Sequence, residues 1–186
     1  MRKKDMDKVA AVKQAVYDIT INEGYQNLSM SKIAKKAGVS QATIYLTYES
    51  KEDMLTSIYV EAKDILDSQT KVDLDPATDI ETKFKQLFTN YVKTLLAHPE
   101  QALYMDAVNN TPELIERNVY QEMMHRNDDI QALVTAGQKA RTSAKVPFPL
   151  LVAFPFVSLH SWMKVPYSHH VEPDEDTIAT PVARCW

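Results

Sequence analysis

Hydroxyl, amide and amine side chains gather in one short stretch, SMSKIAKKAGVSQATIYLTYESK, from Ser29 to Lys51. These groups exchange hydrogen bonds, and the lysines add positive charge. Such a surface suits the binding of nucleic acid. Glutamine can pair with adenine through two hydrogen bonds, and threonine can contact a thymine methyl group. We therefore regard Gln41 and Thr43 as candidates for contact with base edges, although a merely solvated polar face remains the alternative interpretation.

Two short helices joined by a tight turn are predicted to position these side chains. Apolar residues between positions 33 and 37 give the first helix an inner face. Gly38 stands where that helix must end, because glycine adopts the left-handed conformation without steric cost. Ser40 is a good N-cap for a second helix over residues 41–47. This is helix-turn-helix geometry, in which the second helix can enter a DNA major groove.

The charge of the chain is unevenly distributed. The net charge is −4, yet residues 1–52 carry nine Lys or Arg and six Asp or Glu, a balance of +3, which leaves −7 for the remainder. A positive N-terminal quarter is what a local phosphate-binding face requires. The 186 residues are 45% hydrophobic and 25% charged, with three glycines. This composition fits a globular protein and favours an all-α fold.

Apolar residues at helical spacing predict about nine helices and no strand. After the two short helices, a connecting helix is expected over residues 51–69, with Ser50 as its cap. Further helices are expected over residues 6–23, 76–97, 100–108, 111–139 and 147–163, and from 173 or 174 to the end. The helix over residues 147–163 should be kinked at Pro155.

The sequence offers little for catalysis, metal binding or membrane insertion. We find no nucleophile–base–acid set and no glycine-rich phosphate loop, so no enzyme, cofactor or metal is expected. His169 and His170 are adjacent and point in different directions, and Cys185 is the single cysteine. Residues 146–163 lack Asp, Glu, Lys and Arg, but their three prolines favour a buried or interface helix over a membrane span. Because the basic N-terminus is followed by acidic residues rather than an apolar run, we expect a cytoplasmic protein.

Three motifs in order, IAKKAGVS, QATIY and YESKEDML, make the region from about Val9 to Tyr59 resemble the tetracycline-repressor (TetR-like) family of bacterial regulators. The resemblance implies a helix-turn-helix DNA-binding domain over residues 1–52. It implies an effector-binding and dimerisation domain over residues 53–186, with a homodimer formed mainly through the last two long helices. The expected partners are a double-stranded DNA operator and a small effector.

Carried over by position, the resemblance also implies roles for individual residues. Lys51 would bind phosphate at a helix start, and Tyr45 would pack and contact the DNA backbone. Tyr48 would close the DNA-binding domain over residues 1–52, which we call the head. Thr47 stands where many members have histidine, tyrosine or phenylalanine, so its contact is left open. The candidate DNA-binding residues are Ser29, Ser31, Lys32, Ser40, Gln41, Thr43, Tyr45, Thr47, Tyr48 and Lys51. Lys35 and Lys36 would contribute general electrostatic attraction.

Large aromatic and methionine side chains are abundant in the remainder of the chain. Most should form the core, but a ligand cavity between helices needs such walls with a few polar tips. The candidate ligand-binding residues are Phe88, Tyr91, Tyr104, Met105, Tyr120, Met123, Met124 and Phe154. The protein is expected to be a transcriptional regulator, and first of all a repressor. A small apolar molecule would release it from a pseudo-palindromic operator. The alternatives are a helical small-molecule carrier with a vestigial head and, third, an enzyme in the helical body.

Overall fold

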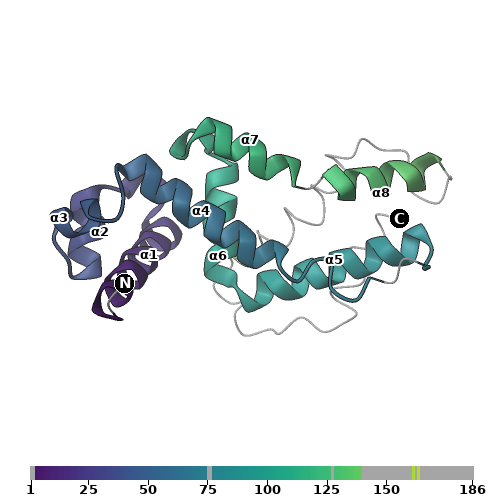
Figure 1. The fold of residues 1–186 in the computed structure, drawn as a ribbon, viewed down its shortest axis with the longest axis horizontal. Coiled ribbons are helices and arrows are strands. Elements are labelled where there is room, and N and C mark those ends of the chain that lie inside the picture. Colours follow the sequence, from purple (N-terminus) through teal and green to yellow (C-terminus); the bar gives the residue numbers. More distant parts are fainter. Residues whose placement is uncertain (1–2, 75–76, 127, 140–160, 162, 164–186) are drawn as a thin grey trace. The chain divides into compact units, whose positions relative to one another are not determined.

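The computed structural model describes residues 3–74, 77–126, 128–139, 161 and 163. Over these residues the protein consists of α-helices with two short 3-10 helices and no strand (Figure 1). The all-α expectation is confirmed. The elements are α1 (Lys3–Glu23), η1 (Tyr25–Asn27), α2 (Met30–Ala37), α3 (Gln41–Tyr45), α4 (Lys51–Asp67), α5 (Ile80–Ala97), α6 (Pro99–Asn109), η2 (Pro112–Leu114), α7 (Arg117–His125) and α8 (Asp128–Lys139).

The chain folds into two compact units. The first unit contains residues 1–63 and 100–121, and the second contains residues 64–99 and 122–186. The first unit therefore holds α1, α2 and α3 together with most of α4 and with α6. The functional division predicted after residue 52 stays a prediction.

The core of the first unit is made by the apolar faces of its first four helices. Each of these helices buries at least one aliphatic side chain or methionine almost completely, which removes its apolar surface from water. The side chains that are at most 2% exposed include Val16, Ile19, Ile33, Ile44, Met54 and Ile58. Their helical spacing in the sequence follows from this packing, since one face of each helix points inward.

Buried polar contacts hold the segment that begins at residue 100 against the other helices of the first unit. Tyr104 of α6 is fully buried, and its hydroxyl donates a hydrogen bond to the Leu55 carbonyl oxygen at 2.9 Å. Its ring meets the ring of Tyr17 edge to face, with centroids 5.4 Å apart. The Glu116 N–H donates to the Thr56 hydroxyl at 3.0 Å. These contacts tie α6 and the residues after it to α1 and α4.

In the second unit, α5 supplies much of the described core. Phe84 and Phe88 lie one turn apart and stack, with ring centroids 6.5 Å apart, and both are buried. The Asn90 side chain donates to the Val72 carbonyl at 2.8 Å and so holds the loop that precedes the helix. Helix α5 contacts α8, whose Val134 is fully buried.

Two predicted helices differ clearly from the observed ones, and the helix predicted over residues 41–47 ends at Tyr45. Helix α5 begins at Ile80 rather than at residue 76, because Asp79 is its N-cap and accepts a hydrogen bond from the Thr82 N–H at 2.9 Å. The single helix predicted over residues 111–139 is divided into η2, α7 and α8. The chain is extended at Ile115, with φ −130° and ψ 168°, so the run of helical residues is interrupted there. The helices predicted from 147 and from 173 lie outside the described residues, except for Ser161 and Met163.

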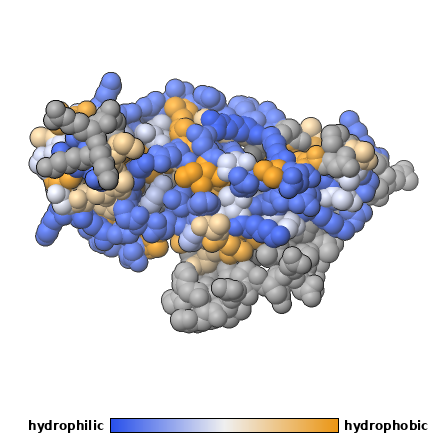
Figure 2. Space-filling model, turned by 60° about the horizontal axis from the view of Figure 1, so that its bottom comes forward, coloured by the Kyte–Doolittle hydropathy of each residue, from blue (hydrophilic) through white to orange (hydrophobic). Residues whose placement is uncertain are grey.

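The face of the protein drawn in Figure 2 is mainly polar. On the face drawn in Figure 2, hydrophilic residues predominate and the apolar residues form small separate areas. Within the ranges that the structure describes, no helix combines the length and the apolar character needed to cross a membrane.

Candidate nucleic-acid interface

Local hydrogen bonds fix the turn between α2 and α3. Gly38 has φ 68° and ψ 28°, a left-handed conformation, and its N–H donates back to the carbonyls of Ala34 and Lys35. The Val39 N–H also donates to the Ala34 carbonyl, at 3.0 Å. Ser40 then caps α3, accepting from the Thr43 N–H at 3.1 Å. The sequence signals for a helix stop and a helix start are therefore both realised within three residues.

Helix α3 is short and is held by one buried anchor. Ile44 is 2% exposed, whereas Tyr45 is 51% exposed. The side chains that point to solvent from this part of the chain include Ser40, Gln41, Tyr45 and Thr47. Thr43 is half-buried, and its hydroxyl lies 2.9 Å from the hydroxyl of Ser40. Tyr48 is only 6% exposed, so it packs against the rest of the first unit, and its role in DNA binding stays a prediction.

Leu46 is an exposed residue of this surface that the sequence interpretation passed over. It is 86% exposed, although it is large and apolar. It stands directly after α3, where its N–H donates to the Ala42 carbonyl at 3.2 Å, so its backbone is fixed by the helix. Its position three residues after Thr43 was a usable signal, because residues at that spacing share a helix face.

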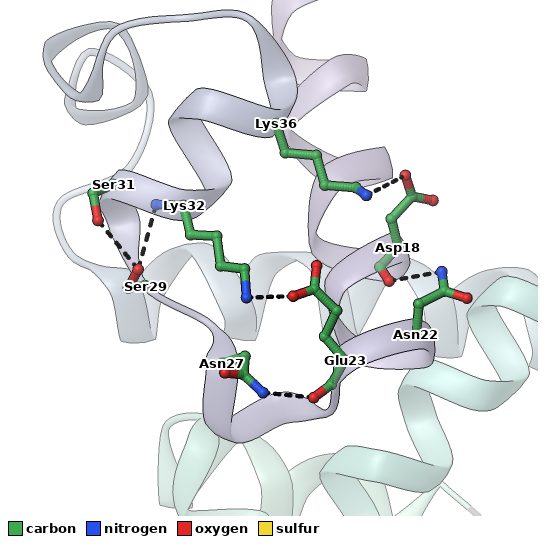
Figure 3. Close-up of polar contacts among 8 residues, drawn as sticks. All are labelled: Asp18, Asn22, Glu23, Asn27, Ser29, Ser31, Lys32 and Lys36. Atoms are coloured by element: carbon green, nitrogen blue, oxygen red, sulfur yellow. Dashed lines mark hydrogen bonds and ion pairs between the residues drawn. The ribbon is translucent and has the colours of Figure 1, made fainter.

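The lysines of α2 differ in their surroundings (Figure 3). Lys32 forms an ion pair with Glu23 at the end of α1, and Lys36 pairs with Asp18 at 3.4 Å. Lys35 is exposed and forms no ion pair with any residue in the described ranges. Two of the three positive charges on α2 are thus partly compensated by α1.

The start of α2 is ordered by two serines. The Ser29 hydroxyl caps the helix by accepting from the Lys32 N–H at 3.3 Å, and it lies 3.2 Å from the Ser31 hydroxyl. Both serines are exposed. The Asn27 side chain donates to the Glu23 carbonyl at 2.6 Å and fixes the approach to the cap (Figure 3).

Lys51 occupies the first position of α4. Ser50 caps the helix by accepting from the Asp53 N–H at 3.0 Å, and the Asp53 carboxylate accepts from the N–H of Glu49, one residue before the cap, at 2.8 Å. No residue of the described ranges forms an ion pair with Lys51. Its ammonium therefore accompanies a helix N-terminus, where the first backbone N–H groups lack intrahelical acceptors. Cation and N–H groups together suit a phosphate oxygen.

The candidate ligand-binding residues are divided between the two units. The first unit contains Tyr104, Met105 and Tyr120, and the second contains Phe88, Tyr91, Met123 and Met124. Burial raises the pKa of the Tyr104 phenol well above its ordinary value, so this group stays a neutral hydrogen-bond donor to the core. Phe154 lies outside the described residues. The ligand-binding role of this set stays a prediction.

The described residues contain no cluster of three or more His, Cys, Asp or Glu side chains placed to hold a metal ion. The residues that the sequence analysis considered as metal ligands, His169, His170 and Cys185, lie outside the described ranges.

Comparison with known proteins gives one family match and several structural relatives. Residues 19–58 match the model of the bacterial regulatory proteins of the tetR family. The fatty acid metabolism regulator protein of Bacillus subtilis (strain 168) is 39% identical over 59 residues. That alignment covers 32% of the present chain and 30% of the relative.

Among solved structures, a TetR family transcription regulator from Marinobacter aquaeolei VT8 superposes with a TM-score of 0.78 at 23% identity, covering 98% of this chain and 95% of that one. A fatty acid degradation regulator from Bacillus halodurans superposes with a TM-score of 0.66 at 22% identity, covering 99% and 94%. At these identities the structural likeness establishes the fold.

Proposed function

We propose that this chain, which belongs to the tetR family of bacterial regulatory proteins, regulates transcription by binding DNA through α3. The observation that carries the proposal is the outward polar face of α3 on its buried Ile44 anchor. This face lies inside the region that matches the family model. The matched proteins are regulators, which supports a binding function without a catalysed reaction.

In the proposed complex, contacts to phosphate position the head and contacts to bases specify the sequence. Lys51 and the N-terminus of α4 would hold one phosphate, and Ser29 and Ser31 at the start of α2 would hold another. Gln41 at the exposed start of α3 would read a base edge. Lys35 would add attraction that is independent of sequence and sensitive to salt.

We further propose a homodimer that binds an inverted repeat. A two-fold symmetric protein presents two identical recognition helices, so its half-sites must be related by the same symmetry. The dimer would form through the last two predicted helices, over residues 147–163 and from 173 to the end, as the family resemblance implies. A repressor bound in this way would block transcription until an effector releases it.

The proposed effector is an apolar small molecule. Aromatic and methionine side chains supply the apolar walls that such a ligand needs. Two relatives are named as regulators of fatty acid metabolism and fatty acid degradation, and this favours an acyl-chain derivative as the first ligand to test. To move the equilibrium from 1:99 to 99:1, the effector must bind the released state about 5.5 kcal/mol more tightly than the DNA-bound state.

Selection of bound duplexes from a random library by the full-length protein tests the proposal. We expect enrichment of an inverted repeat, and release of the selected duplex by a long-chain acyl derivative but not by a short-chain one. Failure to retain any duplex at low salt would contradict the proposal and favour a small-molecule carrier with a vestigial head.

A further inference from the structure

We propose that Leu46 is a specificity-determining residue that packs against the methyl group of a thymine in the major groove. This inference rests on the proposed DNA-binding function and extends it to a base that the operator must contain. It starts from the exposure of Leu46, 86%, which exceeds that of the other exposed large apolar residues: Met6, Ile21, Tyr25, Tyr45, Val72 and Met124.

The exposure excludes a role for the Leu46 side chain in the core of the first unit. A leucine stabilises a fold in proportion to the apolar area that it removes from water, and Leu46 removes almost none. Ile44, two residues earlier and 2% exposed, already anchors the helix. The Leu46 side chain is therefore available to an external partner.

Leu46 shares its surface with the polar residues proposed to face DNA. Leu46 directly follows α3 and keeps helical backbone angles, φ −72° and ψ −20°, so it continues the face of Thr43 at the i, i+3 spacing. Thr43, Leu46 and Thr47 line the same surface hollow of about 460 Å³, together with Asp5, Lys8, Val9 and Val12 of α1 and with Ile44 and Tyr48. Among the large apolar residues of this hollow only Leu46 is exposed, because Val12, Ile44 and Tyr48 are buried and Val9 is half-buried. One exposed leucine is too small a patch for a protein–protein interface, which buries on the order of 800 Å² on each partner.

The major groove offers such a side chain one apolar partner. The base edges there present hydrogen-bond donors and acceptors, and only thymine adds an apolar group, the C5 methyl. Contact with this methyl would remove apolar surface of both partners from water. Burial of one methyl group corresponds to about a fourfold change in dissociation constant.

Thymine-to-deoxyuridine substitution in the selected operator tests the proposal, because it removes the methyl group and preserves base pairing and charge. Wild-type protein should lose about fourfold in affinity at one or two thymines in each half-site. Leu46→Ala should bind the unsubstituted operator more weakly by a similar factor and should be indifferent to deoxyuridine at those same positions. Its thermal unfolding should match that of the wild type.

Two matched variants make the result specific. Val72→Ala also truncates an exposed apolar side chain, 41% exposed and outside the head, and should keep the wild-type deoxyuridine profile. Lys51→Ala should weaken binding to every duplex while preserving the penalty at the same thymines. The assignment would be overturned if Leu46→Ala kept the same losses of affinity at the deoxyuridine positions as the wild type. It would also be overturned if no deoxyuridine substitution weakened binding by the wild type. If the wild-type protein bound no DNA at all, the proposed function would be overturned together with the role of Leu46.

Discussion

Replacement of Glu23 by glutamine should strengthen DNA binding. Glu23 forms an ion pair with Lys32 in the first turn of α2, next to Ser29 and Ser31. The substitution keeps the shape of the side chain and removes its negative charge. Lys32 would then be free to neutralise a phosphate, and the head would gain one positive charge.

The magnitude follows from counterion release. Each additional phosphate that is neutralised steepens the slope of log K against log salt concentration by about 0.9. Across a fourfold change in salt, Glu23→Gln should therefore lose about 3.5-fold more affinity than the wild type, and it should bind more tightly at the low-salt end. The fold should tolerate the change, because an exposed ion pair contributes about 0–1 kcal/mol to stability. The hydrogen bond from Asn27 reaches the backbone carbonyl of Glu23 and is untouched.

Fluorescence anisotropy with a labelled operator at several salt concentrations measures both slopes. Glu81→Gln is the matched control, because Glu81 also forms an exposed ion pair, with Lys85 on α5, and its loss changes the net charge equally. This control lies in the second unit and should leave the slope unchanged. Equal slopes for Glu23→Gln, Glu81→Gln and the wild type would refute the idea that Lys32 reaches a phosphate.

Substitutions at three further positions test other parts of the structure. Lys51→Ala should weaken binding to all duplexes and reduce the salt slope by about 1, whereas an unchanged slope would remove Lys51 from the contacts. Gly38→Ala should lower the free energy of unfolding by about 1–2 kcal/mol in urea titration, because φ is 68° there while the added methyl group meets no atom within 4 Å. Gly38→Asn should cost less, and equal losses for the two would argue against a conformational origin. Tyr104→Phe should lose about 1 kcal/mol through the missing hydrogen bond to Leu55, and a neutral result in the same titration would show that this bond adds no stability.

The head could be predicted closely from the sequence because its signals are local. Gly38 ends one helix and Ser40 starts the next, and each acts through hydrogen bonds within four residues along the chain. The apolar spacing that places Ile33 and Ile44 inside is likewise a property of single helices. These features need no knowledge of distant residues.

The features that were missed depend on tertiary contacts. The interruption near Ile115 coincides with a long-range contact, because the Glu116 N–H beside it donates to the Thr56 hydroxyl, sixty residues earlier. The pairing of Lys32 with Glu23 joins the end of one helix to the start of another across a turn. The exposed Leu46 directly follows the end of α3 at Tyr45, two residues earlier than predicted. Helical periodicity alone carries none of this information.

The specificity ratio of the wild-type protein is the most direct test of recognition through α3. The dissociation constants for the selected operator and for a scrambled duplex of equal length would be measured at the same physiological salt concentration. A sequence-specific regulator should prefer the operator by about 10³-fold or more, and Gln41→Ala should reduce that preference. Equal affinities of the wild type for the two duplexes would contradict the account.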